Sequence, residues 1–319
     1  KKINRILFHH HSLHQKTRHE NETIALDHLD ELRDDFALRG RCEMFRVDLK
    51  SMAAAHQLHQ GTNLRGHLVW AKMPHFQKLL TIRNVQAPEE DEDILQFFRE
   101  HHDPAIFMER HAMRRGEFRK LISPLVRSGH LVQDYRGGFK AVEPLATSDL
   151  WEVKRDYLRD LVKDYPVITL KQVERLAGSP FSAEEISDVM REFEEDDTLI
   201  KGFLVDDMHD VCWGRHDLLE GSDVLTKTRD LVIPPSDPLI HYYGSLLRER
   251  FGYGSAYLVF HREEPVAAFK ANTREGVIHI TDFVGDSDLE KEALRVMKEF
   301  AWEHDMPLKG KLYERLRSR

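Results

Sequence analysis

Apolar residues recur along the chain at two spacings, one typical of helices and one typical of strands. In the first part of the chain, two helical patterns each run up to a glycine, Gly40 and Gly61. The expected elements are helices over 20–39 and 49–61, extended segments over 42–49 and 64–73, and a solvated acidic linker or helix start over 88–93.

The following stretch has the order helix, helix, hairpin. An amphipathic helix is expected over 93–103, two short helices within 107–129, strands over 130–135 and 139–145, and a glycine-containing turn at 136–138. This order is that of a winged helix, a relative of the helix-turn-helix.

The same order returns after residue 148. Thr169 can cap one of the new helices, and Ser182 and Glu185 have the spacing of a capping box. Helices are expected over 149–166, 169–178 and 182–197, and two strands within 197–213. We interpret this as a second winged helix, and residues 50–73 as a partial third copy because they match the end of the pattern.

After Gly221 the pattern changes to strands. The expected elements are a strand from residue 231 that enters a proline-rich turn, a short helix over 241–252, strands over 256–261, 265–271 and 277–283 with turns at Glu263-Glu264 and Glu275-Gly276, and a closing helix over 287–305 capped by Ser287. Strands that meander and are then covered by a helix predict a small antiparallel barrel or sheet.

The fold class is therefore expected to be α+β, with tandem winged-helix domains followed by a small antiparallel β-barrel-like domain with a closing helix. The 319 residues are 41% hydrophobic, which is enough for several cores. We expect an N-terminal helical and partial winged-helix region (1–87), a basic winged helix (88–147), an acidic winged helix (148–221) and a β-barrel-like domain with a basic tail (222–319).

The net charge of -8 conceals winged helices of opposite charge. Residues 107–140 contain eight Lys or Arg, and Lys and Arg bind phosphate. This winged helix is expected to contact double-stranded DNA through Arg114, Arg115, Arg119, Lys120, Arg136 and Lys140. The alternative is a solvated helix face with ion pairs along the helix. Residues 182–210 carry eleven acidic side chains, so the second winged helix is expected to be structural or to face a protein partner.

Other chemistry is sparse. The histidines His9, His10, His11 and His14 lack the spread of ligands of a zinc site, so we expect no metal and no other cofactor. Cys42 and Cys212 form no CxxC pair, which favours a reduced cytoplasmic location, and Cys212 is expected to belong to a core. No apolar run approaches the roughly 18 residues of a membrane span.

The segment that leads into the last three strands is expected to line a cleft. Asp237 starts a rigid turn, and Tyr242 and Tyr243 follow it; these tyrosines are interpreted either as barrel core or as stacking partners for a base. Lys270 and Arg274, on the following hairpin, would belong to the same cleft.

The order of these parts resembles the winged-helix DNA glycosylases that act on alkylated purines and interstrand crosslinks, and is also similar to the C-terminal region of Lhr-type helicases. The matching stretches, within residues 64–304, are LRGHLVWAKMPHFQKLL, HLVQDYRGGFKAV, LIKGFLVDDMHDVCW, VIPPSDPLIHYYGSLLRERFGY, YLVFHREEPVAAFKANTREGVIHI and LEKEALRVMKEFAWEH.

This resemblance implies DNA binding and raises the question of catalysis. Glycosylases of the family carry a Gln-x-Gln or Gln-x-Asp motif that positions and activates the attacking water. Gln15 matches the first position, but Thr17 stands at the second and cannot act as a base at neutral pH. In addition, Phe269-Lys270-Ala271 stands where crosslink-unhooking relatives tend to have Asp-x-Lys.

Three functions are consequently left open. The first is DNA binding in repair or regulation. The second is hydrolysis of the N-glycosidic bond of an alkylated or crosslinked base, with Gln15 as catalytic residue. The third is docking on a helicase or another DNA-processing protein through the acidic winged helix.

Overall fold

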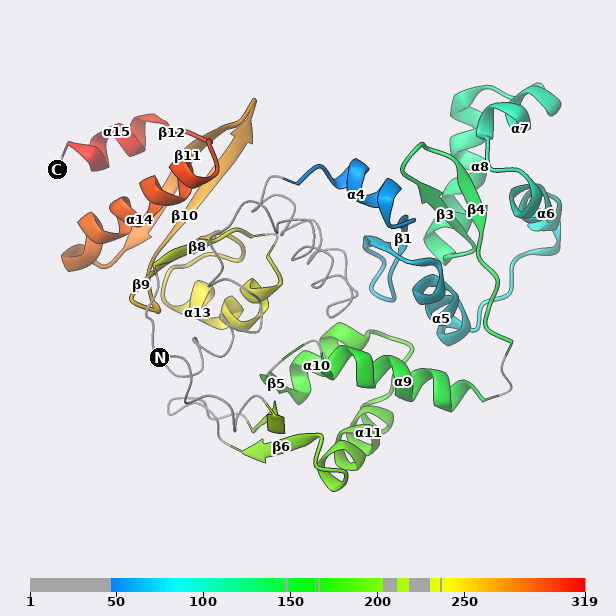
Figure 1. Ribbon diagram of the computed structural model, residues 1–319, viewed down its shortest axis with the longest axis horizontal. Helices are drawn as coiled ribbons and strands as arrows, with labels where there is room; N and C mark the ends of the chain where they lie inside the picture. Colours follow the sequence, from blue (N-terminus) through cyan, green and yellow to red (C-terminus); the bar gives the residue numbers. More distant parts are fainter. Residues whose placement is uncertain are drawn as a thin grey trace. The chain divides into compact units, whose positions relative to one another are not determined.

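The computed structural model describes residues 47–146, 149–163, 165, 167–202, 211–217, 230–235 and 237–318 (Figure 1). It divides into two compact units. The described residues within 48–217 are called here the winged-helix unit, and residue 47 with those within 230–318 the C-terminal unit. Gln15, Thr17, Cys42 and the N-terminal histidines lie outside the described residues, as does most of the helix and strand expected before residue 47.

The winged-helix unit begins with α4 (Leu49–Ala55), β1 (His59–Thr62), β2 (Leu68–Ala71) and α5 (Met73–Arg83). The helix predicted over 49–61 was too long, because it ends at Ala55 and its last residues form β1. Gly61 does not end a helix. A Cβ atom at this position would lie 2.6 Å from Phe76 and 2.7 Å from Val132, so the glycine allows α5 to pack against the sheet.

The basic winged helix follows, with η2 (Glu89–Asp91), α6 (Glu92–Glu100), α7 (Pro104–Arg110), α8 (Arg115–Ser128), β3 (Leu131–Asp134) and β4 (Phe139–Ala141). The predicted order helix, helix, hairpin is confirmed. Gly129 ends α8 in the left-handed conformation, with φ of 88°, as the sequence predicted. The core between the helices and the hairpin is rich in phenylalanine and contains Phe97, Phe98, Phe107, Phe118 and Phe139.

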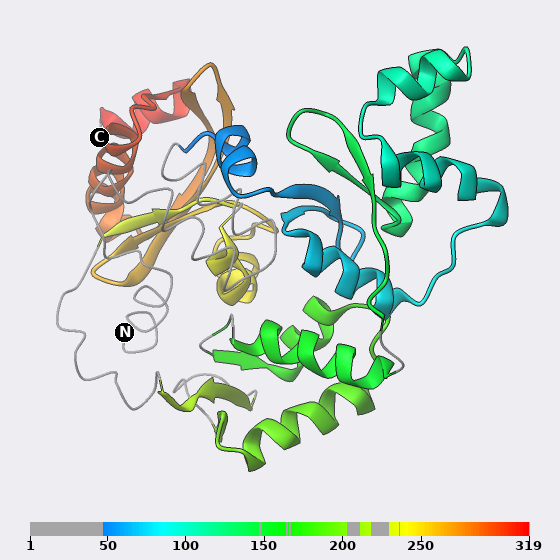
Figure 2. The ribbon, with the colours of Figure 1, turned by 45° about the vertical axis from the view of Figure 1, so that its right-hand side comes forward.

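The hairpins β1–β2 and β3–β4 form one four-stranded sheet in the order β2-β1-β3-β4. The two hairpins join where His59 pairs with Asp134 and Gln60 pairs with Gln133, in antiparallel register. Both views show β1 beside β3 (Figure 2). The wing of the basic winged helix therefore has its inner strand, β3, fixed on both sides.

The acidic winged helix consists of α9 (Leu150–Lys163), β5 (Val167–Thr169), α10 (Leu170–Ala177), α11 (Ala183–Glu195), β6 (Leu199–Gly202) and β7 (Cys212–Arg215). Both predicted caps are present: Thr169 pairs with Gln172, and Ser182 with Glu185, in capping boxes. The strand β5 was not predicted, and it completes a sheet in the order β5-β7-β6. Cys212 is fully buried, as expected of a core residue.

The C-terminal unit contains a five-stranded sheet and its covering helices. Its elements are β8 (Leu231–Ile233), η4 (Pro238–Tyr243), α13 (Gly244–Glu249), β9 (Tyr257–His261), β10 (Glu264–Arg274), β11 (Val277–Gly285), η5 (Ser287–Leu289), α14 (Glu290–Glu303), β12 (Leu308–Lys309) and α15 (Lys311–Arg317). The strand order is β12-β11-β10-β9-β8, and only β12 is parallel to its neighbour. The α+β class and the antiparallel C-terminal sheet with its closing helix are thus confirmed.

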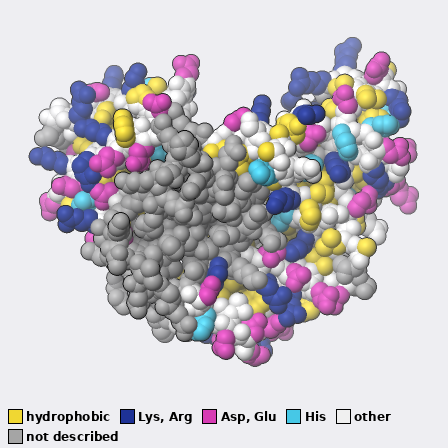
Figure 3. All heavy atoms as spheres, in the orientation of Figure 1, with side chains coloured by type: hydrophobic (Ala, Val, Ile, Leu, Met, Phe, Trp, Pro, Cys, Tyr) yellow, Lys and Arg dark blue, Asp and Glu magenta, His cyan; other side chains and the backbone are white. Residues whose placement is uncertain are grey.

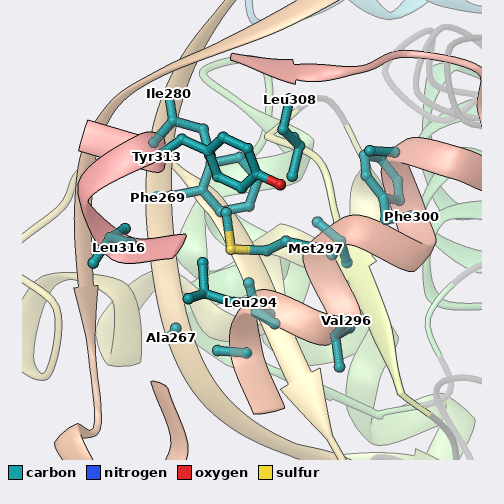
Figure 4. Close-up of a cluster of buried hydrophobic side chains, with 14 of the residues drawn as sticks. Ala267, Phe269, Ile280, Leu294, Val296, Met297, Phe300, Leu308, Tyr313 and Leu316 are labelled. Carbon is teal, nitrogen blue, oxygen red and sulfur yellow. The ribbon is translucent and has the colours of Figure 1, made fainter. Parts of the chain in front are cut away.

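This sheet is covered on both faces. On one face, α14 and α15 bury a cluster around Phe269, Met297 and Leu308 (Figure 4). On the other face, η4 and α13 bury a second cluster that includes Leu239, Tyr243, Leu247, Leu258, Phe260 and Ala268. The first cluster reaches β12, whereas the second covers only the part of the sheet formed by β8, β9 and β10.

Two local predictions for this unit were wrong. The first turn is at Arg262 and Glu263, with φ of 48° and 66°, one residue before the expected position. Ser287 does not cap α14, because the helix begins after Leu289 and the Ser287 hydroxyl lies 3.3 Å from the carboxylate of Asp288. The basic tail also forms β12 and α15, for which no element was predicted.

Candidate nucleic-acid interface

The helix α8 presents a cationic face to solvent. Phe118, Ile122 and Leu125 are buried and define the inward side of the helix. Because successive residues turn by about 100°, Arg119, Lys120 and Arg127 are directed away from the core. Arg114 and Arg115, at the start of the helix, are also exposed. Lys and Arg side chains are visible on this part of the molecule, among acidic, histidine and apolar ones (Figure 3).

The cations of this face have no acidic partner within the part of the chain that the structure describes. No ion pair forms there for Arg114, Arg115, Arg119, Lys120 or Arg127. The alternative of a solvated helix face with ion pairs along the helix is therefore not what α8 shows. Its positive charge is available to an external anion.

Helix α9 provides a contrast, because its cations are engaged by acids. Lys154 lies 2.6 Å from Glu185, and Arg155 contacts Glu192. Arg159 lies 3.3 Å from Asp156. Cationic sequence alone does not distinguish α9 from α8, and the difference lies in the acids that the fold places beside each helix.

Glu117, the acid in the first turn of α8, is hydrogen-bonded to the backbone. The backbone N–H of Arg114 donates to the carboxylate of Glu117 over 2.8 Å. Glu117 therefore caps the helix, a contact that stabilises the first turn, and its charge is directed at the helix end.

The wing is closed by its own acid. One carboxylate oxygen of Asp134 accepts hydrogen bonds from the backbone N–H groups of Arg136 and Gly138, each over 2.8 Å. Gly137 has a φ of 89°, which favours glycine. The guanidinium group of Arg136 lies over the ring of Tyr135, 5.2 Å from its centre, and Lys140 is exposed on β4.

Two histidines lie against the base of the wing. The backbone carbonyl of His102 accepts the backbone N–H of Phe139 over 2.9 Å. The ring Nδ1 of His102 lies 3.1 Å from the backbone carbonyl of Phe139. Burial lowers the pKa of His59, and the charge of Lys140 lowers it further. At neutral pH His59 therefore adds no charge to the wing.

Arg83 fixes the far end of α8 to the sheet. Its guanidinium group donates to the carbonyls of Thr62, Asn63 and Ser128, over 2.8, 2.5 and 3.0 Å. Burial lowers the pKa of Arg83, but an arginine stays protonated in such a site. Arg83 therefore stabilises the fold. The sequence alone does not distinguish it from the exposed cations of α8.

The acidic helix α11 has part of its charge neutralised. Beyond the ion pairs to α9, Glu194 accepts the indole N–H of Trp213 over 2.5 Å and lies 3.5 Å from Lys201. Glu184 and Glu195 are exposed and make no ion pair with another described residue. The acids open to a partner are therefore fewer than the sequence suggests.

The residues expected to form a cleft in the C-terminal unit differ in their burial. Asp237 is buried, and its carboxylate caps η4 by accepting the N–H of Leu239 over 2.9 Å. Tyr243 is buried against Phe260, and burial raises its pKa. Tyr242 is partly buried against the same core, whereas Lys270 and Arg274 are exposed. Two of the five residues thus reach the surface fully.

Two further properties concern the described residues only. Among them, no group of three or more His, Cys, Asp or Glu side chains is arranged to hold a metal ion. None of their helices has the length and apolar character required to cross a membrane.

Comparisons with known proteins point to one fold. No family model matches the sequence, and no curated protein matches it. Among solved structures, the fold is similar to that of the Streptomyces sahachiroi DNA glycosylase AlkZ, with a TM-score of 0.57 and 13% sequence identity. The similarity covers 90% of this chain and 93% of that chain. It confirms the fold resemblance to a DNA glycosylase that the order of elements predicted; the resemblance to Lhr-type helicases stays a prediction.

Proposed function

We propose that this protein binds double-stranded DNA through α8 and the wing of the basic winged helix. The observation that carries the proposal is that the cations of α8 are exposed and have no acidic partner among the described residues. Phosphate neutralisation by such side chains provides most of the affinity of proteins for DNA.

The shape of α8 supports contact with the major groove, which is about 12 Å wide and admits one helix. Gly116 and Ser123 leave short side chains on the outward side, and the longer Arg119, Lys120 and Arg127 lie around them. Helix and wing follow one another in the chain, as in winged helices that place one element in the groove and the other on the backbone. In this arrangement Arg136 and Lys140 contact phosphates.

The proposal is tested by the affinity of the full chain for a fluorescent duplex. Arg119→Ala combined with Lys120→Ala is expected to weaken binding at least tenfold, roughly 1.4 kcal/mol, because two phosphate contacts are lost. The matched control, Arg191→Ala with Lys201→Ala, removes the same charge from the acidic winged helix and is expected to leave affinity nearly unchanged. Equal affinities of the two variants would contradict the interface.

A second candidate function is hydrolysis of the N-glycosidic bond of an alkylated or crosslinked base. It is supported by the similarity in fold to AlkZ, a DNA glycosylase, over most of both chains. In this proposal Gln15 orients the attacking water. Incubation with alkylated duplex DNA is expected to produce abasic sites, and Gln15→Ala is expected to abolish them while duplex affinity is retained. Intact DNA after incubation with the unmodified protein would exclude this activity.

The acidic winged helix is proposed to lie outside the DNA contact and to be the surface for a protein partner in the cytoplasm. Reversal of charge at Glu194 would break its contacts with Trp213 and Lys201, so Glu184→Lys with Glu195→Lys is the sharper change. Loss of a co-purifying protein from this variant, with an unchanged melting temperature, would support the proposal. Co-purification that is unaffected would contradict it.

A further inference from the structure

A second cationic surface lies on the C-terminal unit, and the register of its strands defines it. Phe269, Ile278 and Leu308 belong to the core beneath α14 and α15. Because neighbouring residues of a strand point to opposite faces, Lys270, His279 and Lys309 are directed to the other face of the sheet.

This face carries a row of polar side chains across three strands. Asn272 on β10 pairs with His279 on β11, and His279 pairs with Lys309 on β12. Lys270 and Arg274 flank Asn272 along β10, each about 7 Å away at about 3.4 Å per residue. We call these five residues the open sheet face.

The rest of this side of the sheet is covered by η4 and α13. The cluster of η4 and α13 packs on Leu258, Phe260 and Ala268. Its edge is marked by Tyr253, over whose ring the ammonium group of Lys270 lies, 4.8 Å from the centre. Beyond that edge Asn272, Arg274 and Lys309 are exposed, and His279 is half-buried.

The cations of the open sheet face are also without acidic partners among the described residues. No ion pair forms there for Lys270, Arg274 or Lys309, although Asp282 pairs with Lys270 across the strands. One carboxylate oxygen of Asp282 accepts the backbone N–H of Phe283 over 3.0 Å. Burial raises the pKa of Tyr253, and the charge of Asp282 raises it further.

Some cations of the same unit are paired. Arg250 lies 2.6 Å from Asp286, and Arg295 contacts both Asp230 and Glu299. Others, such as Lys291 and Lys298 on α14, form no ion pair with another described residue. The open sheet face is distinguished because three such cations, Lys270, Arg274 and Lys309, lie on one face of the sheet.

We propose that the open sheet face binds the phosphate backbone of DNA, as a second contact beyond α8 and the wing. This inference rests on the proposed function for the identity of its ligand. Lysine and arginine neutralise phosphates, and Asn272 and His279 supply further hydrogen-bond donors.

The aromatic side chains near this surface favour backbone contact over base recognition. Sheets that bind unpaired bases stack them on exposed aromatic rings. Here Tyr257 is stacked on Phe269, with ring centres 4.7 Å apart, and both rings belong to the opposite side, packed against the α14 core. Contact through the open sheet face is therefore independent of base sequence.

The experiment compares three double variants of the full chain for duplex affinity at several salt concentrations. Arg274→Ala with Lys309→Ala removes two cations from the open sheet face. Lys291→Ala with Lys298→Ala removes two exposed cations from α14, on the other side of the same sheet, and serves as the control. The third variant is Arg119→Ala with Lys120→Ala on α8. Melting temperatures confirm that each variant is folded.

The open sheet face is supported if Arg274→Ala with Lys309→Ala weakens binding at least about fivefold and lowers the salt slope by roughly 0.9 for each lost contact, while the α14 control does neither. If the α8 variant is weakened and this variant matches the control, the inference is wrong and the proposed function stands. If only the open-sheet variant is weakened, the inference stands and the α8 interface is wrong. A parent protein that binds no duplex overturns both.

Discussion

The carboxylate of Asp134 holds the backbone N–H of Arg136 at 2.8 Å, at the tip of the wing. The same oxygen accepts the N–H of Gly138, so the acid that ends β3 closes the turn that presents the arginine. The guanidinium group lies over the ring of Tyr135, 5.2 Å from its centre. Asp134, although acidic, therefore fixes the shape of the cationic wing.

Replacement of this acid should therefore reduce binding, although it removes a negative charge. Asp134→Ala loses two hydrogen bonds to backbone N–H groups and is expected to cost about 1–2 kcal/mol of unfolding free energy. The loosened wing should also bind duplex DNA more weakly. Denaturant titration and duplex affinity measure the two effects. An affinity that increases would show that net charge, and not the geometry of the wing, determines binding.

A side chain at position 116 is expected to affect DNA binding without disturbing the fold. A Cβ atom there would meet nothing within 4 Å, and the backbone is not in the left-handed region, so the fold does not require glycine. Gly116→Leu is expected to raise the free energy of unfolding by about 0.5 kcal/mol, from helix propensity. The same change should weaken duplex binding about tenfold by blocking close approach of α8. Unchanged affinity would place the DNA elsewhere.

Arg83 should behave as a structural cation. Arg83→Met leaves three backbone carbonyls without their donor and is expected to destabilise the winged-helix unit by about 3 kcal/mol. Arg127→Ala, which removes an exposed cation of α8, should change the free energy of unfolding by less than about 0.5 kcal/mol. Thermal melting of both variants provides the comparison. Similar melting temperatures would contradict the role assigned to Arg83.

Asp230 makes the C-terminal unit sensitive to acid. Partial burial alone would raise its pKa, but hydrogen bonds from the Arg262 backbone and from Arg295 and His261 lower it below the ordinary value. A lowered pKa means that the ionised carboxylate stabilises the fold above the pKa of the unfolded chain, about 3.9, and that this stability is lost as pH falls through the lower folded value.

The Asp230→Asn variant tests this dependence. It should be less stable than the parent protein at pH 7, and the difference between the two should shrink as pH falls below about 4. Melting temperatures between pH 3 and pH 7 measure both proteins under the same conditions. A difference that stays constant over this range would show that the charge of Asp230 is not the source of the stability.

Local signals in the sequence predicted local structure well. Thr169 and Ser182 begin helices because their side chains satisfy backbone N–H groups three residues ahead, and both partners are visible in the sequence. Gly129 ends α8 because it adopts positive φ at low cost. Such features depend on a few consecutive residues, so one sequence is sufficient to find them.

Features set by distant contacts were missed. The strand β1 replaces the end of an expected helix because His59 and Gln60 pair with β3, far along the chain, and this contact overrides local helical preference. In the candidate site, the cationic face of α8 was predicted, but its freedom from ion pairs was not. Lys154 and Lys120 look alike in the sequence, and only the fold places Glu185 beside one of them.

The salt dependence of duplex binding measures how many phosphates α8 contacts. The logarithm of the affinity should fall linearly with the logarithm of the salt concentration, with a slope of about 0.9 for each phosphate contacted. Arg119→Ala with Lys120→Ala and Arg127→Ala should reduce that slope by roughly 2–3 relative to the parent protein. A slope that is unchanged in this variant, or an affinity of the parent protein that does not depend on salt, would contradict DNA binding through α8.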